Sequence, residues 1–134
     1  KEWKPMKPGA GHQVPMLLSK IHRATVTDAD LHYEGSITID RRLMDLADLV
    51  AFQQVQVYNV SNGARFETYV IEGEADSGCI CINGAAAHLA GTGDIIIIAA
   101  YVSVPADAIS SWRPRTVYVD AANRPLPAQG AAAE

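Results

Sequence analysis

The sequence predicts a mainly β protein that folds as a small closed barrel with a few short helices. Two observations predict this class: many short segments are rich in Val, Ile, Tyr and Thr, and turn-forming Gly, Asn and Asp residues separate them. A third is size, because 134 residues with a mass of 14.4 kDa suffice for one hydrophobic core without disulfide or metal support. Closure into a barrel is favoured because it removes exposed strand edges.

The strands are expected in eight segments bounded by turn residues and short polar stretches. They cover residues 16–27, 36–39, 54–60, 65–71, 79–82, 94–100, 101–104 and 115–119. The connection between the third and fourth segments contains Asn62-Gly63, which favours a tight hairpin because these residue types accept positive φ angles. Residues 28–30, Asp-Ala-Asp, are expected to form a turn.

One amphipathic helix is expected after the second strand. Asp40 can cap its first turn with a side-chain oxygen. The apolar residues that follow are Leu43, Leu46, Ala47 and Val50. Their spacing of i, i+3, i+4 and i+7 places them on one helix face, which we expect to be buried. Shorter helical turns are expected at residues 84–89 and after Pro105.

Both ends of the chain are expected to lie outside the folded domain. Residues 1–15 hold three of the seven prolines and are interpreted as an N-terminal extension. Residues 122–134 are rich in Pro, Ala and Gly, and they bury too little apolar surface to offset the entropy of ordering. We therefore expect a flexible C-terminal tail there and a single barrel domain over residues 16–121.

Charge and hydropathy exclude two classes of partner. A net charge of −4 and a pI near 5.5 do not provide the clustered Lys and Arg with which proteins bind nucleic acids or anionic membranes. No apolar run approaches the ~20 residues that span a bilayer, and residues 1–15 lack the apolar segment of a secretory signal. A cytoplasmic location is expected.

Cys79 and Cys81 are interpreted as reduced thiols within a strand. Two residues that are two positions apart point to the same face, but their geometry disfavours a mutual disulfide. Together with His88 they would give only three zinc ligands, which is a weak signature. No metal site is therefore expected.

A Gly-Ser pair is common in turns, so Gly35-Ser36 gains meaning only from the motifs around it. These motifs are Lys20-Ile21-His22-Arg23, Leu31-His32-Tyr33-Glu34-Gly35-Ser36, Tyr58-Asn59-Val60-Ser61-Asn62-Gly63, Arg65-Phe66, Thr68-Tyr69 and Asn83-Gly84-Ala85-Ala86-Ala87-His88. In order and spacing they resemble the aspartate 1-decarboxylase family, small pyruvoyl enzymes that make β-alanine for pantothenate synthesis. The resemblance covers about residues 16–118.

The resemblance implies a double-psi β-barrel and a homotetramer with active sites between neighbouring subunits. It also implies decarboxylation of L-aspartate to β-alanine and CO2 by a covalent pyruvoyl group. That group would derive from Ser36 after the chain cleaves itself between Gly35 and Ser36, so an uncut chain would be an inactive zymogen. Gly suits the position before the bond because it lacks Cβ and tolerates strained dihedral angles.

The same resemblance assigns roles to individual residues. Ser36, as the pyruvoyl group, would form the Schiff base, and Thr68 would donate a hydrogen bond during cleavage. Arg65 and Lys20 would hold the two carboxylates of aspartate. Tyr69 would return the proton after CO2 leaves, because a phenol with a pKa of ~10 is protonated at neutral pH. Thr68 and Tyr69 are consecutive, so we expect a local irregularity there or contributions to the sites of two subunits.

Two further groups complete the implied site. Its wall, which would bind substrate or an intermediate oxygen, consists of Asn83, Gly84, Ala85 and Ala86. The supporting positions are His22, Tyr33 and Tyr58. The family often carries Trp at the position of Tyr58, so this chain departs from the family pattern there.

Two alternatives to this function stay open from the sequence. The chain could be a pyruvoyl decarboxylase of another amino acid, although the cations Arg65 and Lys20 favour a dianionic substrate. It could also be an unprocessed barrel module without catalytic activity. The sequence does not say whether a maturation factor assists cleavage.

Overall fold

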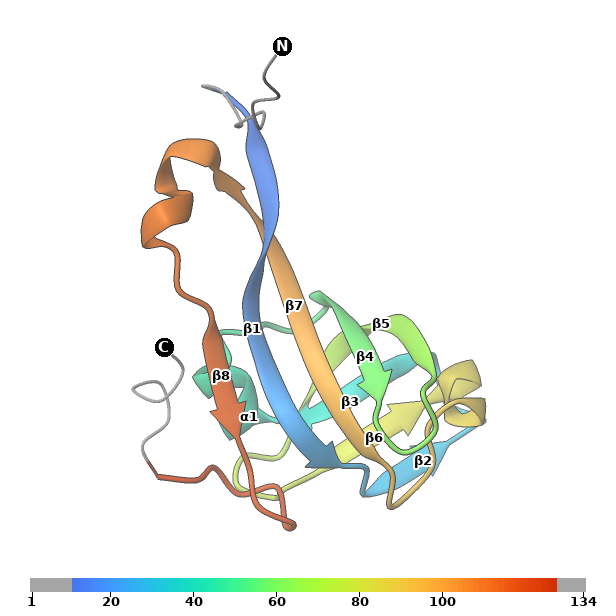
Figure 1. Cartoon of the computed structure of the whole chain (residues 1–134). Coiled ribbons are helices and arrows are strands. Elements are labelled where there is room, and N and C mark those ends of the chain that lie inside the picture. Colours follow the sequence, from blue (N-terminus) through green and yellow to red (C-terminus); the bar gives the residue numbers. More distant parts are fainter. Residues whose placement is uncertain (1–10, 128–134) are drawn as a thin grey trace.

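The computed structural model describes residues 11–127, which form a mainly β fold with three short helical segments (Figure 1). The strands are β1 (Gln13–Thr25), β2 (Asp28–Asp30), β3 (Ser36–Asp40), β4 (Gln54–Asn59), β5 (Arg65–Gly73), β6 (Ile80–Asn83), β7 (Ile95–Pro105) and β8 (Arg115–Tyr118). The helical segments are α1 (Arg41–Leu46) and the 3-10 helices η1 (Gly84–His88) and η2 (Ala106–Ser111). The predicted fold class is therefore confirmed in its strand content.

All strands of the described region belong to one curled sheet with the order β2-β6-β3-β5-β4-β7-β1-β8. The chain leaving β1 contacts β6, although the two strands lie far apart in that order. The backbone N–H of Thr27 donates to the Ile80 carbonyl at 2.8 Å, and the Thr27 hydroxyl accepts from the Ile80 N–H at 2.9 Å. These contacts wrap the sheet into the predicted small barrel. The double-psi topology stays a prediction of the resemblance.

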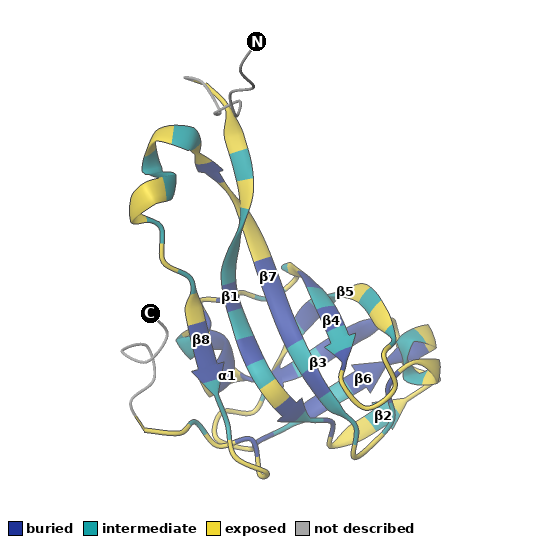
Figure 2. Ribbon diagram, viewed as in Figure 1, coloured by how far each residue is buried: buried dark blue, intermediate teal, exposed yellow. Residues whose placement is uncertain are grey.

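Aliphatic side chains at alternate strand positions fill the barrel. Val55 and Val57 are buried in β4, and Ile96 and Ile98 are buried in β7. A period of two places such residues on one face of the sheet. Figure 2 shows the buried positions gathered where the strands converge, whereas the upper ends of β1 and β7 are mostly exposed or half-buried.

Two predictions about strands are wrong. Residues 28–30 form β2 rather than a turn, because they pair in parallel with β6 at an edge of the sheet, where both aspartates are exposed. The segments 94–100 and 101–104 form one continuous strand, β7, because the long strand β1 pairs with both.

The predicted helix is shorter than its apolar pattern indicates. Asp40 caps α1 as predicted, but the helix ends at Leu46, and Asp48 adopts a left-handed φ of 58°. This change of direction buries Leu49 and leaves Val50 64% exposed. The expectation that Val50 belongs to the buried face is therefore wrong.

The hairpin between β4 and β5 is confirmed. Gly63 adopts a φ of 83°, and the N–H of Asn59 donates to the Ala64 carbonyl at 2.8 Å. The side chain of Asn59 accepts from the Ser61 N–H and donates to Asp94, each at 2.9 Å. The loop occupies residues 60–64 and is longer than a two-residue turn.

Parts of both predicted ends are attached to the barrel. At the N-terminal end, β1 begins at Gln13, which pairs with Pro105 of β7. At the C-terminal end, Asn123 is 1% exposed, and its amide donates to the carbonyls of Thr25 and Gly78, both at 2.8 Å. Residues 1–10 and 128–134 lie outside the described residues.

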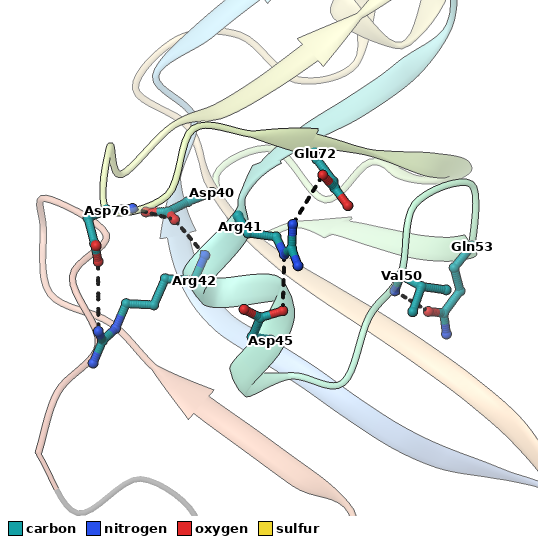
Figure 3. Close-up of polar contacts among 8 residues, drawn as sticks. All are labelled: Asp40, Arg41, Arg42, Asp45, Val50, Gln53, Glu72 and Asp76. Carbon is teal, nitrogen blue, oxygen red and sulfur yellow. Dashed lines mark hydrogen bonds and ion pairs between the residues drawn. The ribbon is translucent and has the colours of Figure 1, made fainter.

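Asp40 joins α1 to the turn before β6 (Figure 3). Its buried carboxylate accepts backbone N–H bonds from Arg42 and Gly78 at 2.8 Å and from Asp76 at 2.9 Å. Replacing Asp40 by Ala leaves these donors without their acceptor, so the free energy of unfolding is expected to fall by about 2–4 kcal/mol. Urea denaturation measures the change.

Asp45 provides the matched control for this prediction. It lies on the same helix, and its side chain is 65% exposed in an ion pair of 3.2 Å with Arg41. Exposed pairs contribute little, so Asp45→Ala is expected to shift the free energy of unfolding by no more than ~0.5 kcal/mol. Equal losses for the two variants would contradict the structural role of Asp40.

Candidate active site

Ser36 is the first residue of β3, and its side chain is held on two sides. The residue is completely buried, whereas the preceding Gly35 is exposed. The Ser36 hydroxyl donates to the Glu34 carbonyl at 3.1 Å and accepts from Nδ2 of Asn83 at 3.0 Å. One lone pair of the hydroxyl oxygen is therefore left for another interaction.

Asn83 owes this position to the pairing of β3 with β6, in which Ser36 and Asn83 are direct antiparallel partners. Its amide nitrogen also donates to the Thr38 hydroxyl at 3.0 Å, and the residue is 5% exposed. The sequence motifs placed Asn83 in a substrate-binding wall but did not indicate its contact with Ser36. Only knowledge of which strands pair could have revealed that contact.

Gly84 packs directly on the backbone around Gly35. Its φ is 77°, and a Cβ at this position would lie 2.6 Å from Cα of Gly35 and 3.1 Å from the Tyr33 carbonyl oxygen. Two glycines in contact thus bring η1 against the Gly35-Ser36 bond. Of the other predicted wall residues, Ala85 is exposed and Ala86 packs against the core.

Strand β5 runs parallel to β3 and carries Thr68 and Tyr69. The pairing of the two strands begins at Ile37 and Val70, so Thr68 and Tyr69 are the two residues of β5 just before the first paired one. The ladder between β4 and β5 is regular through both positions. The expected local irregularity is therefore absent from the β4–β5 ladder. The side chains of Thr68 and Tyr69 accordingly leave opposite faces of β5.

Neither of the two predicted substrate-binding cations is a hydrogen-bond partner of the Ser36 hydroxyl in the described part of the chain. Arg65 precedes Tyr69 by four residues, which is roughly 13 Å along β5. Lys20 lies on β1, and β7, β4 and β5 separate β1 from β3 in the sheet order.

The structure also places the supporting residues His22 and Tyr33. The imidazole of His22 packs edge-on against Tyr118, with ring centroids 5.7 Å apart. Burial, together with the charges of Lys20 and Arg23, lowers the pKa of His22 and favours the neutral ring. Tyr33 is 53% exposed.

Comparison with known proteins identifies the family of this chain. A family model described as Aspartate decarboxylase matches residues 12–126. The chain belongs to the aspartate decarboxylase family. It is 58% identical to the aspartate 1-decarboxylase of Syntrophus aciditrophicus over 109 residues, which are 81% of this chain and 94% of that protein. Identity to the aspartate 1-decarboxylase of Thermoanaerobacter pseudethanolicus is 56% over 111 residues, 83% of this chain and 95% of that protein.

Within this member of the aspartate decarboxylase family, the predicted site residues form two groups. One group surrounds the Gly35-Ser36 bond and is built by β3, the β6–η1 junction and β5. The other lies on β1, β4 and β5. Its members are Lys20, His22, Tyr58 and Arg65.

The described region contains neither a metal-binding cluster nor a helix that could span a membrane. Residues 11–127 contain no cluster of three or more His, Cys, Asp or Glu side chains arranged to hold a metal ion. None of the helices in this range has the length and apolar character needed to cross a membrane. Cys79 and Cys81 are both free thiols, and burial raises the pKa of Cys81.

Proposed function

We propose that this aspartate 1-decarboxylase cleaves itself between Gly35 and Ser36 and uses the resulting pyruvoyl group to convert L-aspartate to β-alanine and CO2 for pantothenate synthesis. The observation that carries the proposal is the placement of the Ser36 hydroxyl between the Glu34 carbonyl and the Asn83 amide, at 3.1 and 3.0 Å. The family assignment over residues 12–126 supplies the reaction.

Cleavage requires the Ser36 oxygen to attack the carbonyl carbon of Gly35. The bond to Asn83 orients this oxygen, and the absence of a Cβ on Gly35 leaves the carbonyl accessible. Thr68, two residues before the Val70 partner of Ile37 on β5, is the proposed donor to the developing oxyanion. The attack forms an ester, breaks the C–N bond between Gly35 and Ser36, and leaves the hydroxyl proton on the freed Ser36 amine.

β-Elimination then breaks the ester and releases the Gly35 carboxylate. The dehydroalanine left at position 36 takes up water and loses ammonia, which gives the pyruvoyl group. The chain thus consumes one water and releases one ammonia as it becomes fragments 1–35 and 36–134.

The surroundings of Ser36 fit a pyruvoyl group at this position, because Asn83 and the start of η1 place polar groups beside it. A pyruvoyl carbonyl condenses with the substrate amine and accepts the electron pair released with CO2. Arg65 and Lys20 supply two positive charges for the two carboxylates of aspartate. A guanidinium binds a carboxylate through paired hydrogen bonds.

We infer that the site is shared between subunits and that Ser36 of one subunit meets Lys20 and Arg65 of a neighbour. The Ser36 hydroxyl contacts Glu34 and Asn83 of its own chain rather than either cation, which supports this arrangement. This arrangement agrees with the homotetramer that the resemblance implies.

Tyr69 is the proposed donor of the proton that replaces CO2. Removing its hydroxyl by Tyr69→Phe is expected to leave self-cleavage intact and to lower kcat by about 10²-fold, the lower range for a lost general acid. Denaturing mass spectrometry measures cleavage, and CO2 release measures kcat. A kcat within about threefold of the parent chain would exclude Tyr69 as the donor.

The substrate assignment is tested by release of labelled CO2 from the cleaved chain. Aspartate is the expected substrate, whereas histidine, arginine and ornithine offer no second carboxylate to the cations. Release from one of these instead of aspartate would favour another pyruvoyl decarboxylase. No release from any of them by a fully cleaved chain would favour a non-catalytic barrel.

A further inference from the structure

Arg65, Tyr58 and Tyr101 form a chain of contacts across three neighbouring strands. The guanidinium carbon of Arg65 lies 3.9 Å from the centroid of the Tyr58 ring. The Tyr58 hydroxyl lies 2.9 Å from the Tyr101 hydroxyl, so the two form a hydrogen bond. Tyr58 pairs with Arg65 on one side and with Ile97 of β7 on the other.

These contacts restrict the rotamers of the Arg65 side chain. Arg65 is exposed, and an arginine side chain loses about 2 kcal/mol of rotamer entropy when it is fixed. The Tyr58 ring attracts the guanidinium through its π face. The Tyr101 hydroxyl anchors the far end of that ring. Burial and the hydrogen bond to Tyr101 raise the pKa of Tyr58, so its hydroxyl stays protonated at neutral pH.

A cavity of about 190 Å³ lies beside this chain of contacts. Its lining includes Gln56, Ala99 and Tyr101. Ala99 pairs with Gln56 on one side and with Lys20 on the other. The cavity therefore lies on the sheet between the strands that carry Arg65 and Lys20. Tyr101 both lines the cavity and contacts Tyr58, the residue against which Arg65 packs.

We propose that Tyr101 is a positioning residue that acts through Tyr58 to hold the Arg65 guanidinium in place for a carboxylate of the substrate. This inference rests on the proposed function, in which Arg65 binds aspartate. An indole at position 58 would present a larger π face and carries no hydroxyl. In this chain, a hydrogen-bonded tyrosine pair supports the guanidinium.

The test is steady-state kinetics of the cleaved full chain with aspartate. Tyr101→Phe keeps the ring and removes the hydroxyl, and KM is expected to rise about fivefold, the ordinary factor for one lost hydrogen bond, with kcat nearly unchanged. Tyr58→Phe removes the same bond, so the double variant is expected to match either single variant. Ser103→Ala, an exposed hydroxyl deletion on the same strand, is the control and is expected to keep the parent KM.

The Tyr58→Trp variant serves as a second parent chain, and it separates a positioning role of Tyr101 from a merely structural one. In the Tyr58→Trp variant, adding Tyr101→Phe is expected to leave KM unchanged, because the indole supports Arg65 without the hydroxyl. An unchanged KM for Tyr101→Phe in the parent chain, or the same rise in the Tyr58→Trp background, would overturn the inference. So would a changed extent of self-cleavage with an unchanged KM.

Arg65→Ala distinguishes this inference from the proposed function. If Arg65→Ala leaves KM for aspartate unchanged, the proposed role of Arg65 fails and the inference fails with it. If Arg65→Ala raises KM but Tyr101→Phe does not, the substrate role stands and only the positioning role of Tyr101 is wrong.

Discussion

Replacing Ser36 by Ala is expected to abolish both self-cleavage and decarboxylation. The variant keeps the buried β3 backbone but has no oxygen to attack Gly35, so neither the ester nor the pyruvoyl group can form. Removing a nucleophile of this kind lowers the rate by at least about 10³-fold. Denaturing mass spectrometry after prolonged warm incubation should show only the intact chain of 14.4 kDa.

The control for this variant is Ser110→Ala. Ser110 is an exposed serine of η2, far in sequence from the Gly35-Ser36 bond. This variant is expected to cleave and to release CO2 as the parent chain does. Normal cleavage of Ser36→Ala, or decarboxylation by it, would show that Ser36 is not the origin of the activity.

The second large effect is expected at Gly84. An Ala there must adopt a φ of 77°, and its Cβ would meet Cα of Gly35 at 2.6 Å and the Gly35 nitrogen at 2.8 Å. The left-handed backbone costs about 1–2 kcal/mol and the overlap about 1–3 kcal/mol more. We expect Gly84→Ala to lower the free energy of unfolding by about 2–5 kcal/mol and to stop cleavage, because η1 and the Gly35-Ser36 bond must move apart.

A Gly63→Ala variant separates the cost of the left-handed backbone from the cost of steric overlap. The φ of 83° at Gly63 carries a similar backbone cost, but a Cβ there would have no atom within 4 Å. Gly63→Ala is therefore expected to lose about 1–2 kcal/mol and to cleave normally. Denaturant unfolding and the cleaved fraction measure both outcomes. If Gly84→Ala matched Gly63→Ala in both measurements, the close contact with Gly35 would have no role in processing.

Local patterns in the sequence were sufficient for much of the fold. Asp40 predicted the start of α1, Asn62-Gly63 predicted the β4–β5 hairpin, and segments rich in Val and Ile between turn residues predicted the strands. These features depend on neighbours within a few residues. The errors at residues 28–30 and at Val50 arose where long-range pairing or a left-handed residue decided the structure.

The sequence motifs named candidate site residues, but they did not indicate how these residues are arranged in space. Motif order named Ser36, Asn83 and Gly84, yet the contacts among their backbones and side chains depend on which strands pair. The hydrogen bond from Asn83 to Ser36 exists because β6 lies beside β3, although 47 positions separate the two residues. Tyr101 was missed for the same reason, because it reaches Arg65 only through Tyr58 on a third strand.

Self-cleavage at Gly35-Ser36 underlies every step of the proposed reaction, and it is measured by the denatured mass of the incubated chain. We expect two fragments, residues 1–35 ending in a free carboxylate and residues 36–134 lighter by one ammonia than a fragment beginning with serine. A single intact chain of 14.4 kDa, or a cut at any other bond, would contradict the account.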